Sequence, residues 1–126
     1  MRPFFTIIIP THNRAQLLER SINSLRAQTF GDFEIIIVSD CADQETFKVA
    51  TSKLSGSDVF IKRKGLPGPA ESRNYGLDIA SGDYVIFLDD DDTLAPSYLV
   101  SIRKPWVFRF KPEAKSTSEG KFASIW

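Results

Sequence analysis

The stretch Ser81-Gly-Asp-Tyr-Val-Ile-Phe-Leu-Asp-Asp-Asp-Asp-Thr93 decides how the rest of the chain is interpreted. A Ser-Gly turn precedes a short apolar run, Tyr84 to Leu88, and four aspartates follow it. The length of the run and its β-branched and aromatic residues predict a buried strand rather than a helix. Four adjacent carboxylates repel one another unless a cation or hydrogen-bond donors compensate. The aspartates therefore form either a solvated acidic turn or a site for a hard cation such as Mg²⁺ or Mn²⁺.

The composition limits the functional classes that the chain can belong to. Its 126 residues, 42% of them hydrophobic, suffice for one globular domain with one core. Sixteen basic and sixteen acidic residues cancel, which argues against nucleic acid as a partner. The single Cys41 excludes an internal disulfide, and the first apolar run, Phe4–Ile9, is too short for a membrane span. We therefore expect no membrane span and a cytoplasmic location.

The hydrophobic pattern predicts strands and helices in strict alternation. The expected strands are Phe4–Ile9, Phe33–Val38, Val59–Lys62 and Tyr84–Leu88, and the expected helices run from Ala15 to about Gln28, from a cap at Asp43 through Phe47, Ala50 and Leu54, and from Pro69 to about Ala80. Pro10 should end the first strand and open a turn in which Asn13 caps the next helix. Pro69 suits the first helical position, where its missing N–H would be unpaired anyway.

This order predicts an α/β fold, a Rossmann-like and mostly parallel sheet with helices on both faces. Right-handed crossovers give the strand order 3-2-1-4. In such a sheet the ligand crevice lies at the carboxyl ends of the strands, where the order reverses. The turn Pro10–Asn13 and the run Asp89–Asp92 should therefore form two lips of one cleft, with Asp40 beside them.

Several motifs, in this order, resemble the N-terminal half of family 2 glycosyltransferases, which have the GT-A fold. They are Thr6-Ile-Ile-Ile-Pro-Thr-His-Asn-Arg14, Ser24-Leu-Arg-Ala-Gln-Thr-Phe30, Phe33-Glu-Ile-Ile-Ile-Val-Ser-Asp40, Arg73-Asn-Tyr-Gly76 and Gly82-Asp-Tyr-Val-Ile-Phe-Leu-Asp-Asp-Asp-Asp92. The resemblance implies transfer of a sugar from a nucleotide diphosphate donor to an acceptor hydroxyl, with inversion at the anomeric carbon. It also implies a saccharide or glycoconjugate acceptor and a site of action at the membrane periphery.

The resemblance assigns the aspartate run to the D-x-D motif of the family. Asp91 would be the ligand of Mg²⁺ or Mn²⁺, and Asp89 or Asp90 would lie near the ribose. Bound to the diphosphate oxygens and a carboxylate, the metal would neutralise the charge that develops on the departing diphosphate. Asp92 would instead cap the following turn.

The resemblance assigns the nucleotide to the ends of the first two strands. Asp40 matches the carboxylate that pairs with the base, and a carboxylate accepting an imide N–H favours uracil, hence a UDP-sugar. The family usually has two adjacent acids here, whereas this chain has Ser39 before Asp40. The nucleotide-binding turn would comprise Pro10, Thr11, His12 and Asn13. His12 falls where the family often has tyrosine, which favours stacking on the base over a role as general base or metal ligand.

Basic residues offer two further expectations. Arg73 would approach the base or the diphosphate, the alternative being a solvent-exposed helix arginine. The run Lys62-Arg63-Lys64 could attract phosphate, but we expect a solvated charge run.

The expected domain division is 1–102 for the nucleotide-diphospho-sugar-binding domain and 103–126 for an atypical tail. The tail has two interpretations: it results from a truncated or frameshifted gene, or it is an unusual segment that helps to cover the sheet. In the second case Trp106, Phe108 and Phe110 could form an edge strand. No carboxylate general base can be identified. The alternatives to an enzyme are therefore a non-catalytic nucleotide-sugar-binding module and, more distantly, a sugar nucleotidyltransferase. Apolar surface left uncovered would favour a homodimer.

Overall fold

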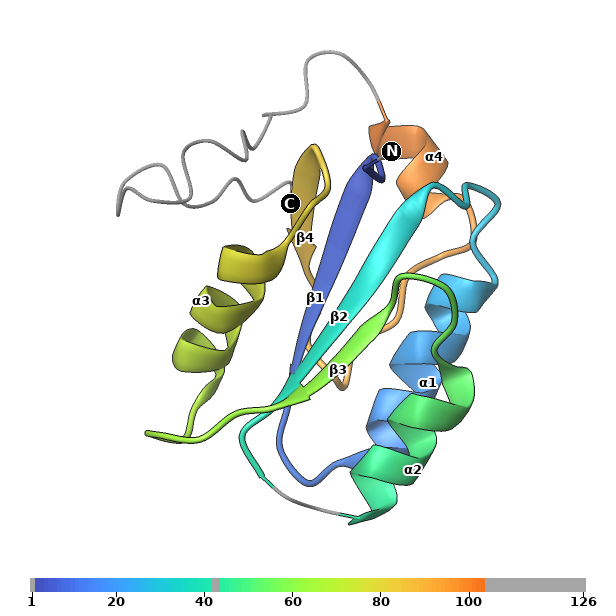
Figure 1. Cartoon of the computed structure of the whole chain (residues 1–126). Coiled ribbons are helices and arrows are strands. Elements are labelled where there is room, and N and C mark those ends of the chain that lie inside the picture. Colours follow the sequence, from blue (N-terminus) through green and yellow to red (C-terminus); the bar gives the residue numbers. More distant parts are fainter. Residues whose placement is uncertain (1, 42–43, 104–126) are drawn as a thin grey trace.

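The computed structural model describes residues 2–41 and 44–103, which form a parallel sheet flanked by helices (Figure 1). The strands are β1 (Phe5–Thr11), β2 (Phe33–Ser39), β3 (Val59–Lys62) and β4 (Tyr84–Phe87), and the helices are α1 (Ala15–Arg26), α2 (Gln44–Lys53), α3 (Pro69–Ile79) and α4 (Tyr98–Ile102). The strand order is β3-β2-β1-β4 and every described pairing is parallel. The predicted fold class and strand order are confirmed.

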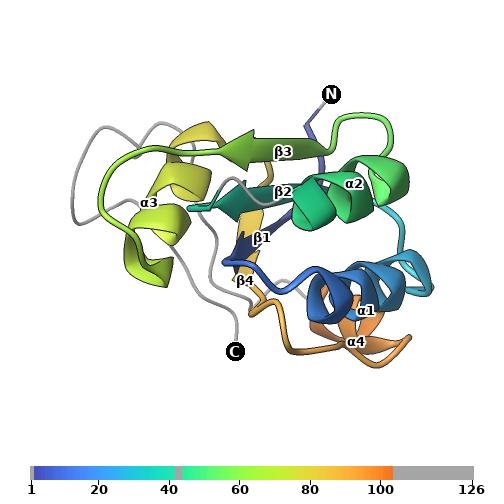
Figure 2. The same ribbon diagram turned by 90° about the horizontal axis from the view of Figure 1, so that it is seen from below.

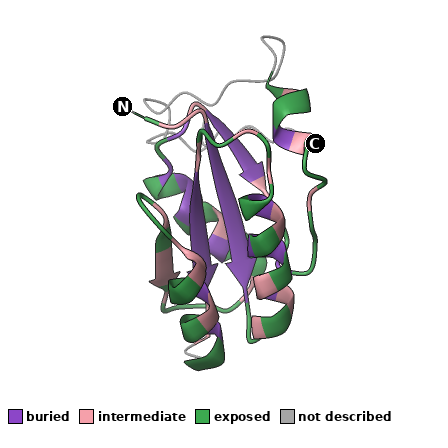
Figure 3. Ribbon diagram, turned by 90° about the vertical axis from the view of Figure 1, so that its right-hand side faces the viewer, coloured by how far each residue is buried: buried purple, intermediate pink, exposed green. Residues whose placement is uncertain are grey.

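The helices cover both faces of the sheet, as the continuous apolar strands predict. Helices α1, α2 and α4 lie on one face and α3 on the other (Figures 1 and 2). Successive residues of β1 alternate between the two cores: Ile7 and Ile9 pack with the α1 side, whereas Ile8 packs with Leu77 of α3. Figure 3 shows the central strands buried throughout and the helices exposed on their outer sides. Each isoleucine buried in this way contributes about 1.5–3 kcal/mol.

Helix α1 forms because its apolar residues recur at helical spacing. Leu18, Ile22 and Leu25 are all buried against the sheet, at positions i, i+4 and i+7. Ser21 is also buried on this helix, close to the chain that follows β4. The helix therefore contributes both to the core and to the fixing of the aspartate run.

Helix α3 approaches the sheet closely because Gly76 has no side chain. A Cβ at this position would lie 2.6 Å from Cγ2 of Ile8, closer than such atoms pack. Pro69 occupies the first turn, as predicted, and the N-cap Gly68 has φ 128°, a conformation that favours glycine. Gly76 therefore allows α3 to pack closely on the sheet face, and Gly68 allows the turn by which the chain enters α3.

The end of β1 differs from the prediction. Pro10 does not end the strand but lies buried within it, opposite Val38 of β2. Ile8 bonds through its carbonyl to Leu88 after β4, and Pro10, two residues later, faces the same side, where β4 has already ended. The missing N–H of Pro10 therefore leaves no ladder bond unmade.

Asn13 is not the helix cap that the sequence suggested. The N-cap of α1 is Arg14, which makes no side-chain capping bond in the described structure, and α1 ends at Arg26 rather than near Gln28. Asn13 has φ 53°, the left-handed conformation that asparagine tolerates better than most residues. Asn13 therefore contributes to the turn through its left-handed backbone conformation.

The second helix follows the prediction in part. Ala50 is buried and Leu54 is partly buried after the helix end, but Phe47 is largely exposed and stacks edge-on against Phe60 of β3. The proposed cap Asp43 and the proposed edge strand at Trp106, Phe108 and Phe110 lie outside the described residues. Within residues 2–41 and 44–103, none of the helices has the length and apolar content needed to cross a membrane.

Candidate functional site

A cleft of about 260 Å³ opens at the carboxyl ends of the strands, where the strand order reverses between β1 and β4. The carboxyl ends of the strands lie at the lower end of the sheet in Figure 1. It is lined by Pro10, Thr11, His12, Arg14, Asp40, Pro69, Ser72, Arg73, Asp89, Asp90 and Asp91. All the predicted site residues except Asn13 therefore meet in one place.

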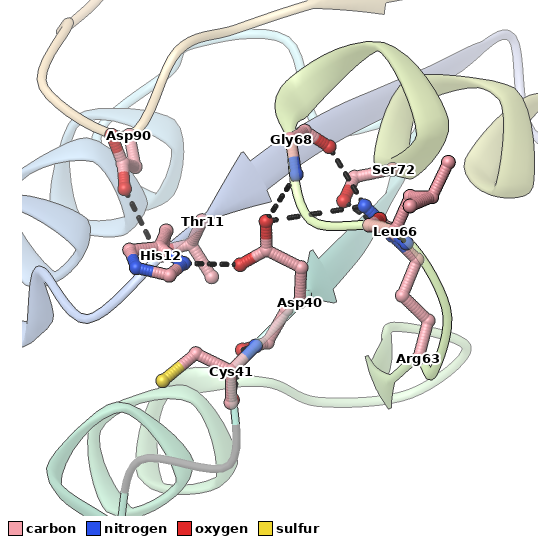
Figure 4. Close-up of polar contacts among 10 residues, drawn as sticks. Thr11, His12, Asp40, Cys41, Arg63, Leu66, Gly68, Ser72 and Asp90 are labelled. Carbon is pink, nitrogen blue, oxygen red and sulfur yellow. Dashed lines mark hydrogen bonds and ion pairs between the residues drawn. The ribbon is translucent and has the colours of Figure 1, made fainter.

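Asp40 is the most firmly held group in the cleft. Its side chain is 5% exposed, its Oδ2 accepts the Gly68 N–H at 2.6 Å, and its Oδ1 lies 2.6 Å from Nδ1 of His12 (Figure 4). Arg63 lies 3.9 Å from Oδ2. Burial disfavours the ionised form, but the bonds from Gly68 and His12 and the charges of His12 and Arg63 outweigh it and hold the pKa of Asp40 below its ordinary value.

Arg63 is not part of a solvated charge run, contrary to the prediction for residues 62–64. Its side chain is only 4% exposed and donates to Oγ of Ser72 at 2.7 Å and to the carbonyls of Leu66 and Gly68 at 2.6 and 2.8 Å (Figure 4). These bonds join the end of β3, the loop before α3 and the first turn of α3. The planar guanidinium satisfies all three partners at once, which a flexible ammonium would do less well. Arg63 therefore fixes the loop whose Gly68 N–H binds Asp40.

His12 projects into the cleft with 63% of its side chain exposed. An ionised carboxylate can only accept, so Nδ1 of His12 donates to Asp40. This bond restrains the ring, whose exposed part faces the cleft. The buried residues Pro10 and Thr11 also line the cleft.

Asp90 is the buried member of the aspartate run. Its carboxylate accepts the Thr11 hydroxyl at 2.8 Å and lies 3.3 Å from Nη1 of Arg14. Its carbonyl accepts the hydroxyl of Ser21 at 3.0 Å, and the same hydroxyl contacts the carbonyl of Asp92. Thr11 of β1 and Arg14 thus hold the side chain of Asp90, and Ser21 of α1 holds its backbone carbonyl.

The other three aspartates are exposed and close together. One carboxylate oxygen from each of Asp89, Asp91 and Asp92 lies within 4.8 Å of the others. The sequence predicted Asp91 as a metal ligand and Asp92 as a turn cap, but the structure places Asp92 close enough to share a metal ion with Asp91. Exposed acids often gather without binding an ion, but these donors are all hard oxygens, the type that suits Mg²⁺ or Mn²⁺, so the residues present fit the expected metal.

Two arginines pair with this exposed cluster. Arg73 of α3 donates to Oδ1 of Asp89 at 2.9 Å, so it is not simply a solvent-exposed helix residue. Arg14 lies 3.6 Å from Oδ2 of Asp91. Both arginines line the cleft.

Sequence reasoning missed four contributors to the cleft. Arg14 closes the first motif, Thr6–Arg14, and its place directly after the nucleotide-binding turn was a usable signal. Ser72 and Pro69 lie in the turn before Arg73, whose role alone was predicted. The N–H of Gly68 carries no sequence signal except the helix-starting Gly-Pro pair.

The family model described as "Glycosyl transferase family 2" matches residues 6–107. A curated relative, the GalNAc(5)-diNAcBac-PP-undecaprenol beta-1,3-glucosyltransferase of Campylobacter jejuni, is 39% identical over 103 residues, which are 79% of this chain and 33% of that protein. The chain spans about a third of the length of the first curated relatives that it matches.

Two solved structures are similar in fold. TarS residues 1–349 of Staphylococcus aureus, in complex with UDP-GlcNAc, superposes with a TM-score of 0.70 and 31% identity, over 80% of this chain and 30% of that one. The mannosyltransferase PcManGT of Pyrobaculum calidifontis, in complex with GDP-Man and Mn²⁺, gives a TM-score of 0.67 over 85% of this chain and 34% of that one. At 21% identity, the second likeness concerns the fold alone.

Proposed function

The chain belongs to glycosyltransferase family 2, and we propose that its cleft binds a nucleotide diphosphate sugar, a UDP-sugar in preference, for transfer of the sugar to an acceptor hydroxyl. The observation that carries the proposal is the convergence of Asp40, His12, Arg73 and the aspartate run on one cleft at the strand ends. The likeness to a transferase solved with UDP-GlcNAc supports the same class of donor.

Asp40 is the group that we assign to the base. Its carboxylate is ionised and held by two donors, and each oxygen has a second lone pair that can accept from a ligand. A fixed acceptor favours the imide N–H of uracil and disfavours cytosine, which presents an acceptor at the same position. The exposed ring of His12 offers a stacking surface for the base.

The diphosphate lies, in this proposal, at the exposed aspartates. Asp91 is the expected metal ligand, Asp89 and Asp92 lie close enough to share it, and Arg73 is placed to donate to phosphate oxygens. A bound Mg²⁺ or Mn²⁺ supplies charge neutralisation on the departing diphosphate. Because Asp90 is occupied by Thr11 and Arg14, Asp89 is the better candidate for a contact with the ribose.

The reaction that follows is a direct displacement at the anomeric carbon, with inversion. Asp40 and His12 would hold the nucleoside, and Arg73 would orient the diphosphate as leaving group, so that the acceptor hydroxyl attacks from the opposite side. The acceptor is, in this proposal, a saccharide or glycoconjugate, which agrees with the undecaprenol-linked acceptor in the name of the Campylobacter relative. A cytoplasmic site at the membrane periphery fits such an acceptor.

Calorimetric titration tests the proposal. UDP, CDP, GDP and dTDP are titrated into the chain with and without MnCl₂. We expect UDP to bind in the presence of Mn²⁺ and more weakly without it. CDP should bind about 5-fold to 150-fold more weakly than UDP, because an unmatched acceptor pair costs about 1–3 kcal/mol. Equal binding of UDP and CDP would remove Asp40 from base recognition.

Release of UDP from UDP-sugars distinguishes transfer from binding alone. An enzyme releases UDP when a suitable acceptor is added, whereas a nucleotide-sugar-binding module binds the donor and leaves it intact. Failure of all four nucleotides to bind, with and without metal, would overturn both functions.

A further inference from the structure

The cleft contains more acid than base at its surface. Its lining includes four carboxylates, Asp40, Asp89, Asp90 and Asp91, against two guanidiniums, Arg14 and Arg73. The charge of Arg63, 3.9 Å away, neutralises that of Asp40. The excess negative charge of the cleft therefore lies on the aspartate run. An anionic diphosphate entering alone would meet this negative field, and the arginines that could attract it are already paired with aspartates.

Arg14 occupies the centre of this charge arrangement. Its Nη1 lies 3.3 Å from Oδ1 of Asp90 and 3.6 Å from Oδ2 of Asp91, so one guanidinium spans the buried and the exposed acid. About half of its side chain is exposed, unlike that of Arg63. Arg14 directly precedes α1 and lines the cleft. Its exposed guanidinium can therefore turn from Asp91 toward a ligand.

We propose that Arg14 exchanges partners and so couples metal binding to diphosphate binding. In the empty cleft it neutralises Asp91, and when a divalent cation takes that carboxylate, Arg14 donates to the diphosphate. The inference rests on the proposed function and adds to it a residue and a reason for cooperativity between the two ligands.

Relative bond strengths favour this exchange. An exposed ion pair at 3.6 Å is weak, because water screens it and the long side chain loses freedom. A guanidinium bonded to phosphate gains shorter, charge-assisted and often bidentate hydrogen bonds. The metal competes with Arg14 for Asp91, but the diphosphate draws Arg14 away. Each ligand thus removes an obstacle to the other, and by linkage the coupling is equal in both directions.

The test uses the full chain and three titrations: MnCl₂ alone, UDP alone, and UDP at saturating MnCl₂. For Arg14→Gln we expect two effects of opposite sign. Mn²⁺ alone should bind about threefold more tightly, because an exposed competing ion pair is lost. UDP at saturating Mn²⁺ should bind about tenfold more weakly, because a charge-assisted contact to phosphate is lost. The electron paramagnetic resonance signal of free Mn²⁺ gives an independent measure of the first effect.

Arg20→Gln is the matched control, since Arg20 is an exposed arginine of α1, the helix that follows Arg14, and does not line the cleft. It makes the same change in net charge and should alter neither affinity by more than about twofold. Arg14→Lys keeps the charge but not the planar fork, so Mn²⁺ alone should bind as in the parent and UDP should bind about threefold more weakly.

Affinities for Mn²⁺ and for UDP that fall together, or that both stay unchanged in Arg14→Gln, would overturn the exchange. If that variant does not fold by thermal denaturation, Arg14→Lys decides: parental affinity for UDP would overturn the proposal. Failure of the parent chain to bind UDP with Mn²⁺ would instead overturn the proposed function itself.

Discussion

The two groups of acids at the strand ends differ in how they are held. Asp40, after β2, has a side chain that is 5% exposed and receives a backbone N–H, an imidazole and the charge of a buried arginine. Asp91, after β4, is half exposed, and among the described residues its ion pair is with Arg14, 3.6 Å away. The sequence places both in the same structural position, the first residues beyond a parallel strand.

The difference indicates that the site around Asp40 is preformed, whereas the partners of the exposed aspartates can be exchanged. The surroundings of Asp40 are fixed by Arg63 and Gly68, so the site assigned to the base is built before a ligand arrives. The exposed aspartates keep weak partners that a cation can replace at little cost. Variants of the first group should therefore affect stability, and variants of the second should affect binding.

Arg63→Met should cause the largest loss of stability, and it tests most directly whether the surroundings of Asp40 are rigidly built. The change removes the donor of the buried Ser72 hydroxyl and of the Leu66 and Gly68 carbonyls, and it takes away the buried charge beside Asp40, so we expect a loss of about 3–5 kcal/mol in the free energy of unfolding. Urea denaturation followed by circular dichroism measures it. Lys64→Met is the matched control, because Lys64 is exposed and adjacent, and it should change stability by at most about 0.5 kcal/mol. A loss below 1 kcal/mol in Arg63→Met would mean that the loop does not depend on this residue.

Asp91→Ala should give the next largest effect, on binding rather than on stability. Loss of a metal ligand is expected to weaken Mn²⁺-dependent binding of UDP by about 100-fold, which equals about 2.7 kcal/mol. Calorimetry measures the affinity, and thermal denaturation should show a fold as stable as that of the parent. Asp32→Asn, an exposed acid before β2, removes one charge outside the cleft and should leave binding unchanged. Parental affinity in Asp91→Ala would move the metal to other residues.

The fold could be predicted from the sequence because periodicity and turn residues specify it locally. The continuous apolar runs at Ile7–Ile9 and Ile35–Val38 already required cover on both faces, and the alternation with helices then left few topologies. The failures came where tertiary context decides. Pro10 continues its strand only because β4 has ended beside it.

The candidate site was predicted through its residue types but not through their partners. Arg63 looked like one of three solvated basic residues, since nothing local indicates that Ser72 and two loop carbonyls surround it. Asp90 looked equivalent to its neighbours, although Thr11 and Ser21, far away in sequence, make it the buried one. Such pairings depend on long-range contacts, which periodicity does not encode.

Lowering the pH should reduce the stability that Asp40 contributes, an effect smaller than those expected for Arg63→Met and Asp91→Ala. The pKa of Asp40 is lowered in the folded chain, because its hydrogen bonds and neighbouring charges outweigh the cost of its burial. The stabilisation is therefore complete above the ordinary aspartate pKa of about 3.9 and is lost as the pH falls through the lower native value. Asp40→Asn should be less stable than the parent at pH 7, and the difference should narrow in acid. Urea denaturation from pH 7 to pH 3 measures this, and Asp32→Asn should instead keep the parental slope.

Asp89→Asn should have the smallest effect on stability. A small effect is required if the exposed aspartates are held more weakly than Asp40. Asp89 accepts from Arg73 at 2.9 Å, a normal hydrogen-bond distance, but the two side chains are 53% and 36% exposed to water. Screening and the entropy of two long side chains leave such a pair worth about 0–1 kcal/mol, so we expect a change of about 0.5 kcal/mol or less in the free energy of unfolding. Urea denaturation at low and at 0.5 M salt measures both the change and its screening. A loss above 2 kcal/mol would show that exposure does not separate the two groups of acids, and that the aspartate run is as rigidly built as the surroundings of Asp40.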